Sequence, residues 1–166
     1  MLLVAANDRH LSFFTALNGD VEVMRNITGQ PRSRSETELE WSRRLALRTD
    51  ADRGLGDWTG YVDGQPVGWW GLGFSDSDPQ SGELGFRLLA RHWRQGLGSE
   101  GARLLLCHGF TNSRVDRVWA GTGTANLASR ATLAALGLEC TAEPFPGVLT
   151  YEITHDQWAA RAAGNS

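Results

Sequence analysis

The feature that most constrains the fold is a pair of apolar runs, residues 58–62 and 66–74, joined by Asp63-Gly64. An Asp-Gly pair suits the tight primed turn between two antiparallel strands, so this stretch predicts a β-hairpin. Further strand patterns cover residues 1–6, 82–89, 115–121, 138–142 and 148–154. Strands are therefore expected to dominate the middle of the chain.

Helical patterns interrupt these strands. They cover residues 8–17, 20–27, 35–49, 97–110 and 126–136, with a last helical turn after Asp156. Ser35 followed by Glu38 matches a capping box at the start of the third helix, and Gly137 is a stop signal for the fifth. Because strand and helix patterns are mixed along the chain without a linker, the expected fold class is α+β, with a mixed α/β sheet in a single domain spanning 1–166.

Charge and hydropathy exclude several classes of protein. The formal net charge of the 166 residues is −3, whereas a nucleic-acid-binding protein usually has a basic excess, so no nucleic-acid partner is expected. No run approaches the length of a membrane span, and the apolar start lacks a basic leader, which predicts a cytoplasmic protein without a membrane partner. All 16 basic residues are Arg, which excludes a Schiff-base lysine and a P-loop lysine.

No metal site is expected. The four His residues are scattered, and Cys107 and Cys140 lie far apart without a CxxC pair. Both cysteines occur in apolar stretches, which predicts buried or half-buried thiols.

The sharpest local feature is the segment 91–100, which follows a strand and opens a helix. Gly96 and Gly98 leave room for close approach to the backbone, and the first helical turn offers unpaired N–H groups at the positive end of the helix dipole. Arg91 and Arg94 add positive charge beside them. This arrangement predicts a phosphate or pyrophosphate site, although an ordinary glycine-rich helix entry has the same pattern.

Several blocks in the same order carry a family resemblance over nearly the whole chain. The blocks are Glu83-Leu84-Gly85-Phe86, Trp93-Arg94-Gln95-Gly96-Leu97-Gly98 followed by Ser99-Glu100, the strand Val118–Gly121, Asn126-Leu127-Ala128-Ser129, and Gly137-Leu138. The stretch 82–140 resembles the core of the GNAT N-acetyltransferase superfamily, in particular its RimJ/RimL-like (ribosomal-protein N-acetyltransferase-like) branch. The resemblance implies a mostly antiparallel, twisted sheet of about six to seven strands, splayed in the middle and flanked by about four helices.

The resemblance also implies that acetyl-CoA is the cosubstrate, bound in the splay between 82–89 and 115–121. Backbone amides of 95–99 would hold its pyrophosphate, an N–H near Leu88 would polarise the thioester carbonyl, and Asn126 would bind the pantetheine arm. The full set of expected binding residues is Phe86, Leu88, Leu89, Arg91, Arg94, Gln95, Gly96, Leu97, Gly98, Ser99, Asn126 and Ser129.

The implied reaction is direct attack of a primary amine on the thioester, which needs a base and an acid. Glu83 is the expected base, alone or through a water, with Glu143 as an alternative. A structural ion pair of Glu83 with Arg87 or another Arg is the competing interpretation. Ser129 is expected near the CoA sulfur, as an acid or only as a hydrogen-bond partner, because the following helix lacks the Tyr found in many relatives.

The acceptor stays open among a peptide N-terminus, an aminoglycoside-like amine, a polyamine and an amino acid. A short link between the last two strands departs from protein-acetylating relatives, and the chain could form a homodimer. Acids at Asp20, Glu22, Asp76 and Asp78 could attract a cationic amine. A non-catalytic CoA-binding sensor or regulatory module of the same fold is the alternative function.

Overall fold

The computed structural model describes residues 1–74 and 78–164. The strands are β1 (Leu2–Ala5), β2 (Gly56–Val62), β3 (Gln65–Gly73), β4 (Ser81–Leu88), β5 (Arg117–Gly123), β6 (Glu139–Phe145) and β7 (Val148–Thr154). The helices are α1 (Leu11–Gly19), α2 (Val21–Met24), α3 (Arg34–Leu47), α4 (Leu97–Thr111), α5 (Leu127–Leu136) and α6 (His155–Gly164), with 3₁₀ turns η1 (Asp8–His10) and η2 (Ala90–His92). The expected mixed α/β class is confirmed.

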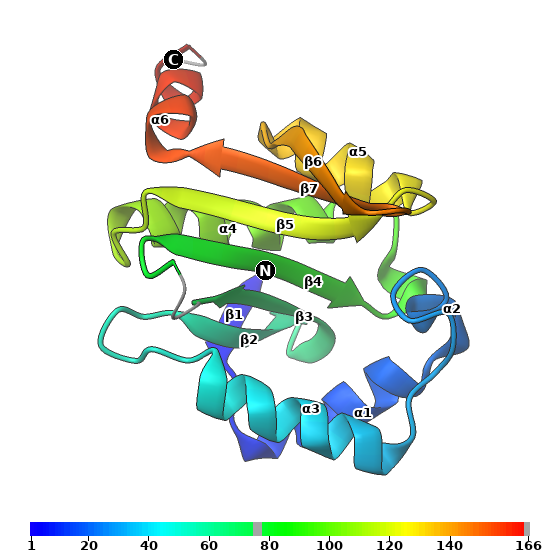
Figure 1. Cartoon of the computed structure of the whole chain (residues 1–166). Coiled ribbons are helices and arrows are strands. Elements are labelled where there is room, and N and C mark those ends of the chain that lie inside the picture. The colour runs from blue at the N-terminus through cyan, green and yellow to red at the C-terminus, as the bar shows by residue number, and fades with distance from the viewer. Residues whose placement is uncertain (75–77, 165–166) are drawn as a thin grey trace.

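The seven strands form one sheet in the order β1-β2-β3-β4-β5-β7-β6. Every neighbouring pair is antiparallel except β4 and β5, which are parallel. Helices α1 and α3 lie on one face of this sheet and α4 and α5 on the other (Figure 1). The described residues contain six α-helices rather than about four, because the one-turn α2 and the terminal α6 add to the flanking set.

The sheet is splayed at its centre. Strands β4 and β5 pair only at their first residues, Ser81–Glu83 against Arg117–Trp119. Beyond Glu83 the two strands diverge, and the gap between their ribbons widens toward their C-terminal ends (Figure 1). The facing backbone edges of β4 and β5 are therefore open to a ligand along most of their length.

Two hydrophobic cores lie on opposite faces of the sheet. Because side chains alternate along a strand, neighbouring Trp69 and Trp70 of β3 point in opposite directions. Trp70 is fully buried in the core shared with α4 and α5. Trp69 is buried in the second core, with Phe14 of α1 and Trp41 of α3.

Trp70 fixes the start of α4 to the sheet. Its indole N–H donates a hydrogen bond to the carbonyl oxygen of Gly98 over 3.3 Å. A Cβ atom at Gly60 would overlap the indole ring, and one at Gly101 would lie 2.5 Å from it. A Cβ at Gly68 would also lie 3.0 Å from the ring, so glycines on three sides leave room for Trp70, and this packing positions the first turn of α4.

Gly101→Ala is expected to destabilise the fold, because the added methyl group meets the buried Trp70 ring. Overpacking of this kind costs about 1–3 kcal/mol, which for a chain of this size lowers Tm by about 2–12 °C. Thermal unfolding measures the change. Gly19→Ala is the matched control, since Gly19 is also helical and a Cβ there meets nothing within 4 Å. Equal Tm values for the two variants would contradict the packing argument.

Local sequence signals explain most helix and turn boundaries, but the N-terminal cap of α3 lies two residues earlier than predicted. The Asp63-Gly64 turn forms as predicted, with φ values of 50° and 75°. Gly137 ends α5 in the left-handed region at φ 94°, also as predicted. The capping box of α3 is Ser33 with Glu36 rather than the predicted pair, because the sequence fits the same pattern two residues earlier.

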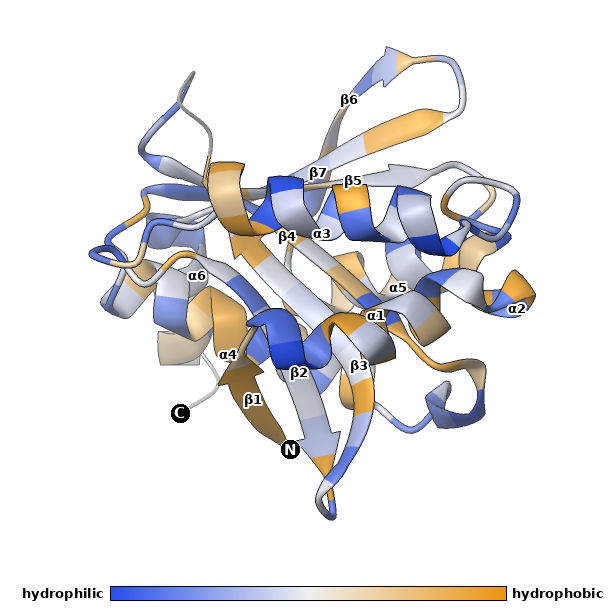
Figure 2. Cartoon of the chain, turned by 90° about the horizontal axis from the view of Figure 1, so that it is seen from below, coloured by the Kyte–Doolittle hydropathy of each residue, from blue (hydrophilic) through white to orange (hydrophobic). Residues whose placement is uncertain are grey.

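The expected burial of the two thiols is wrong. Cys107 and Cys140 are free and exposed. Cys107 lies on the outer face of α4, and Cys140 lies in β6, all of whose residues are exposed. Figure 2 shows β6 projecting away from the helices at the end of the sheet. No helix within the described residues is long and apolar enough to cross a membrane.

Candidate active site

The splay opens into a cleft that runs between β4 and β5. Two adjoining hollows of about 430 and 530 Å³ make up this cleft. Both are lined by Asn26, Ile27, Phe86, Arg87, Asn126 and Ser129, so they form one continuous space. We call the part beside β3 and α3 the Glu83 end and the part beside the start of α4 the Gly96 end. Most of the expected binding residues and both expected catalytic residues line this cleft.

The Gly96 end is formed by the start of α4. Gly96 occupies the N-cap position with φ 78°, a conformation that favours glycine, and makes no side-chain cap. The first bond of the helix runs from the Glu100 N–H to the Gly96 carbonyl over 2.9 Å. The N–H groups of Leu97, Gly98 and Ser99 precede it and have no partner within the helix. A Cβ at Gly96 would touch nothing within 4 Å, so its outer side is open. The site therefore fits an anion.

The loop between β4 and α4 is held by its own hydrogen bonds. The Trp93 indole donates to the Leu88 carbonyl over 2.9 Å, and the Gln95 amide donates to the Arg91 carbonyl over 3.0 Å. The Leu89 N–H donates to the Val67 carbonyl of β3. Because N–H groups alternate along a strand, the Leu88 N–H points the other way, into the splay.

Three of the expected binding residues lie outside the lining. The side chain of Leu89 is buried in the second core, and Arg91 and Gln95 are exposed in the loop without lining the cleft. Phe86, Leu88, Arg94, Gly96, Leu97, Gly98, Ser99, Asn126 and Ser129 line the Gly96 end. The loop residues thus shape the cleft, while the lining comes from β4, α4 and α5.

Glu83 lies at the opposite end of the cleft and carries an ion pair. Its Oε2 atom accepts a hydrogen bond from Nη1 of Arg48 over 2.5 Å. Arg48 follows the last residue of α3, and a Cβ at Gly73 of β3 would lie 2.5 Å from its Nη2 atom. The guanidinium therefore lies flat on β3 to reach Glu83. The partner is one of the other Arg residues considered from the sequence, and not Arg87.

Arg87 belongs to a buried network beneath the cleft. It donates from Nη1 to Asn18 over 2.6 Å and from Nη2 to Glu40 over 3.1 Å. Arg44 donates to the same Glu40 over 2.9 Å and lies 4.3 Å above the Trp69 ring. Burial disfavours the charged form of Glu40, but the charges of Arg87 and Arg44 outweigh it and lower the pKa of Glu40 below its ordinary value.

The start of α5 completes the lining. The Asn126 side chain caps this helix, accepting the Ser129 N–H over 3.1 Å. Ser129 is half-buried and lines both hollows, so it lies between the two ends of the cleft. Glu143, the alternative base, does not line the cleft and instead accepts the Gly147 N–H over 2.9 Å in the β6–β7 turn.

Sequence reasoning missed several lining residues. Asn26 and Ile27 come from the segment after α2, and Arg44 and Arg48 come from α3 and the residue that follows it. No local motif marks them, because their place depends on how α3 packs across β3.

The acids expected to attract a cationic amine are engaged elsewhere. Asp20 caps α2, Glu22 pairs with Arg25, and Asp78 pairs with Arg117. Asp76 lies outside the described residues. Among the described residues, the Glu83 end has three Arg side chains and one carboxylate, which gives it a basic rather than an acidic lining.

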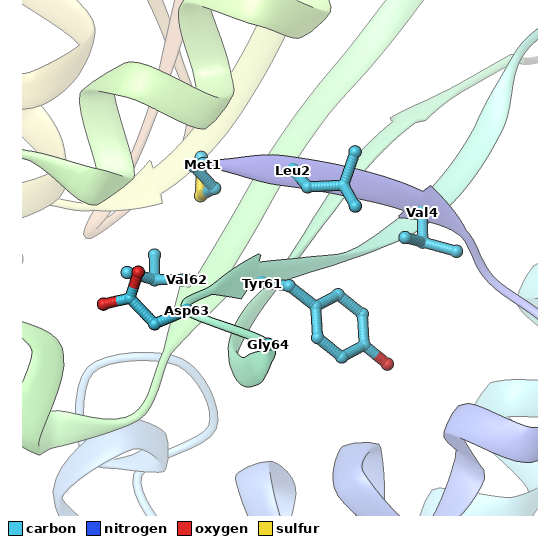
Figure 3. Close-up of a pocket in the computed structure, with 7 residues that line it drawn as sticks. All are labelled: Met1, Leu2, Val4, Tyr61, Val62, Asp63 and Gly64. Carbon is cyan, nitrogen blue, oxygen red and sulfur yellow. The ribbon is translucent and has the colours of Figure 1, made fainter.

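A separate hollow of about 520 Å³ lies beside the edge strand β1. Figure 3 shows its lining from β1 and from the β2–β3 turn, with Asp63 as its one acidic side chain. None of the expected site residues lines it. In the part of the chain that the structure describes, no group of three or more His, Cys, Asp or Glu residues could hold a metal ion.

Comparison with known proteins identifies the family. The chain matches the model of the family described as "Acetyltransferase (GNAT) domain" over residues 1–139. It is 31% identical over 175 residues to the FsC-acetyl coenzyme A-N(2)-transacetylase of Aspergillus fumigatus, covering 94% of this chain and 74% of that protein. The protein is thus an acyltransferase. The chain belongs to the GNAT acetyltransferase family.

Solved structures show the same fold at low identity. An aminoglycoside acetyltransferase in complex with coenzyme A has a TM-score of 0.80 at 14% identity, covering 96% of this chain and 98% of that one. RimL, a ribosomal alpha-N-protein acetyltransferase in complex with coenzyme A, has a TM-score of 0.75 at 18% identity, covering 93% and 94%. The splayed sheet is therefore the GNAT fold.

Proposed function

We propose that the chain transfers an acetyl group from acetyl-CoA to a primary amine by direct attack. The observation that supports this most strongly is the continuous cleft of the splay, which joins the anion-binding start of α4 to the carboxylate of Glu83. The A. fumigatus relative is, by its name, a transacetylase that uses acetyl coenzyme A and acts at a nitrogen. We also propose that the chain belongs to the RimJ/RimL-like branch, which its motif blocks resemble; the fold shared with RimL is compatible with this.

The lining of the cleft fits acetyl-CoA. The N–H groups of Leu97, Gly98 and Ser99 would bind the pyrophosphate, with the Arg94 guanidinium as a positively charged neighbour. The Leu88 N–H, directed into the splay, would donate to the thioester carbonyl oxygen. Asn126 lines the cleft and uses its Oδ1 atom for the helix cap, so its amide nitrogen would donate to the pantetheine arm.

Acetyl-CoA supplies the thioester from which the acetyl group is taken. The amine nitrogen attacks the carbonyl carbon, so that an N–C bond forms while the C–S bond breaks. Glu83 accepts the proton that the acceptor ammonium must lose, directly or through a water. As the N–C bond forms the nitrogen loses a second proton, and the leaving sulfur takes up one proton to become the CoA thiol. Ser129, which lines both hollows, is the expected donor or hydrogen-bond partner of the sulfur, and its hydroxyl regains a proton from the nitrogen or from solvent.

Release of free CoA thiol with a panel of amines tests the proposed function. The panel contains a short peptide, an aminoglycoside, a polyamine and several amino acids, each with acetyl-CoA. Thiol release that depends on one of these amines, together with its acetylated product by mass spectrometry, is the expected result. Tight binding of acetyl-CoA with no amine-dependent release across the panel would contradict acetyl transfer to these amines.

Gly96→Val is expected to weaken CoA binding by about tenfold or more. Valine at φ 78° is strained, and its side chain would stand where the backbone must approach the pyrophosphate. Isothermal titration with CoA measures the affinity. Gly64→Val is the matched control, because Gly64 has φ 75° and equally open surroundings but lies in the β2–β3 turn. Unchanged CoA affinity in Gly96→Val, or an equal loss in both variants, would refute the role of this turn.

A further inference from the structure

The Glu83 end of the cleft has an excess of positive charge. Its charged lining consists of Arg44, Arg48, Arg87 and Glu83 within the described ranges 1–74 and 78–164. A carboxylate at the start of β4 thus faces three guanidinium groups. An acceptor with a second positive charge would be repelled here, whereas an acceptor with a negative group would be attracted.

The carboxylates behind this lining do not balance it. Glu40 is shared, since Arg32, Arg44 and Arg87 all pair with it at 2.9–3.4 Å. Asp57 is buried with its carboxylate 3.8 Å from Arg44, and burial raises its pKa above the ordinary value despite the nearby Arg charges. Counted with Arg32, four guanidinium groups stand against three carboxylates (Glu40, Asp57 and Glu83), so the Glu83 end keeps one positive charge in excess.

Of the three Arg side chains, Arg48 has the most N–H groups that are not used in hydrogen bonds within the protein. Arg87 and Arg44 are tied to Glu40, and Arg87 also to Asn18. Arg48 uses Nη1 for Glu83, its Nη2 atom makes no hydrogen bond to the described residues, and its side chain is 23% exposed against 15% for Arg44 and 8% for Arg87. A guanidinium has five N–H donors, and its planar fork matches a carboxylate in two parallel hydrogen bonds.

We propose that the acceptor has a free carboxylate a few bonds from its amine, as in an α-amino acid, and that Arg48 binds this carboxylate. The inference rests on the proposed function, because it takes Glu83 as the group that accepts the proton of the amine. Arg48 and Glu83 are in direct contact, so an amine held at Glu83 places only nearby atoms of the acceptor at Arg48. An α-carboxylate meets this spacing. Diamines and peptide N-termini lack that charge.

Matched pairs of compounds that differ only in this carboxylate test the proposal. The pairs are L-leucine with 3-methylbutylamine, L-phenylalanine with 2-phenylethylamine, and L-lysine with 1,5-diaminopentane, and the methyl ester of each amino acid is a third member. Two readouts are measured, kcat/KM from CoA thiol release and Kd by calorimetry on enzyme saturated with CoA. We expect the best amino acid to exceed its decarboxylated partner by at least about tenfold in both, with the ester close to the amine.

Variants of Arg48 assign the effect to this side chain. Arg48→Gln is expected to lower the ratio of kcat/KM between the amino acid and its decarboxylated partner by about tenfold or more, whereas any effect on Glu83 changes kcat/KM for both compounds alike. Arg48→Lys keeps the positive charge but loses the planar guanidinium that can make two parallel hydrogen bonds. It should recover part of the preference for the amino acid. Arg43→Gln is the control, because Arg43 is an exposed residue of the same helix that does not line the cleft. Thermal unfolding confirms that each variant is folded.

The outcomes separate this inference from the proposed function. Thiol release with no advantage for the amino acids, or an advantage that persists in Arg48→Gln, would overturn carboxylate recognition and leave amine acetylation intact. Carboxylate-dependent binding without release of CoA in any pair would overturn acetyl transfer to this class and support recognition. If no pair shows either binding or turnover, the carboxylate proposal is overturned.

Discussion

Glu83→Gln should lower kcat for acetyl transfer by about 10²–10⁴-fold, because glutamine cannot accept the proton that the acceptor ammonium loses. Glutamine has nearly the same shape and can still accept the hydrogen bond that Arg48 donates to Glu83. The Kd for CoA should therefore stay unchanged, since Glu83 lies at the other end of the cleft from Gly96. CoA thiol release at saturating acetyl-CoA and amine measures kcat, and calorimetry measures the Kd.

Glu143→Gln is the informative control for this experiment. Glu143 is the second carboxylate that the sequence offers as a base, but its side chain accepts the Gly147 N–H in an exposed turn. We expect this variant to keep its activity. Full activity in Glu83→Gln with a large loss in Glu143→Gln would assign the base to the β6–β7 turn instead, and loss in neither variant would favour a base provided by solvent.

Glu40→Gln should produce the largest loss of stability, about 3–5 kcal/mol, because it removes the one carboxylate that pairs with three Arg side chains. For a chain of this size the loss corresponds to a fall in Tm of about 6–20 °C. Glu38→Gln is the control on the same helix, since Glu38 pairs, among the described residues, only with the exposed Arg34 and should change Tm little. Similar Tm values for both variants would contradict the importance of the buried network.

The pH dependence of stability gives this prediction a second, independent readout. The pKa of Glu40 is lowered in the folded chain, because its Arg partners outweigh the effect of burial. The stabilisation from ionised Glu40 is therefore complete above its ordinary pKa of 4.5 and is lost as the pH falls through the lower folded value. The difference in unfolding free energy between wild type and Glu40→Gln should be constant near neutral pH and shrink below about pH 4.5. A difference that does not change with pH would argue against an ionic role.

The sequence predicts the fold well because its strongest signals are local. The Asp63-Gly64 turn and the helix stop at Gly137 each depend on residues close in the chain. Even the error at the α3 cap is local, since two overlapping patterns compete and the one beginning at Ser33 forms.

The site is predicted only where a motif lies on a contiguous segment. The Gly96–Ser99 turn and Asn126 belong to such segments, and the structure brings them to one cleft. The pairing of Arg48 with Glu83 joins residues 35 positions apart and depends on the packing of α3 across β3. The same holds for Glu40, whose three partners come from a loop, its own helix and β4. Such contacts arise from tertiary packing and cannot be inferred from residue types and their spacing along the chain.

The brief pairing of β4 and β5 has a mechanical consequence. Among the described residues, the half of the sheet with β1–β4 and the half with β5–β7 are hydrogen-bonded to each other only near Ser81–Glu83, at one end, while α4 packs against both. A molecule that hydrogen-bonds to both strand edges beyond that point would cross-link the two halves of the sheet at the end where they are not paired. Its binding energy then adds to folding stability, and it makes the two halves unfold as one cooperative unit rather than in separate steps.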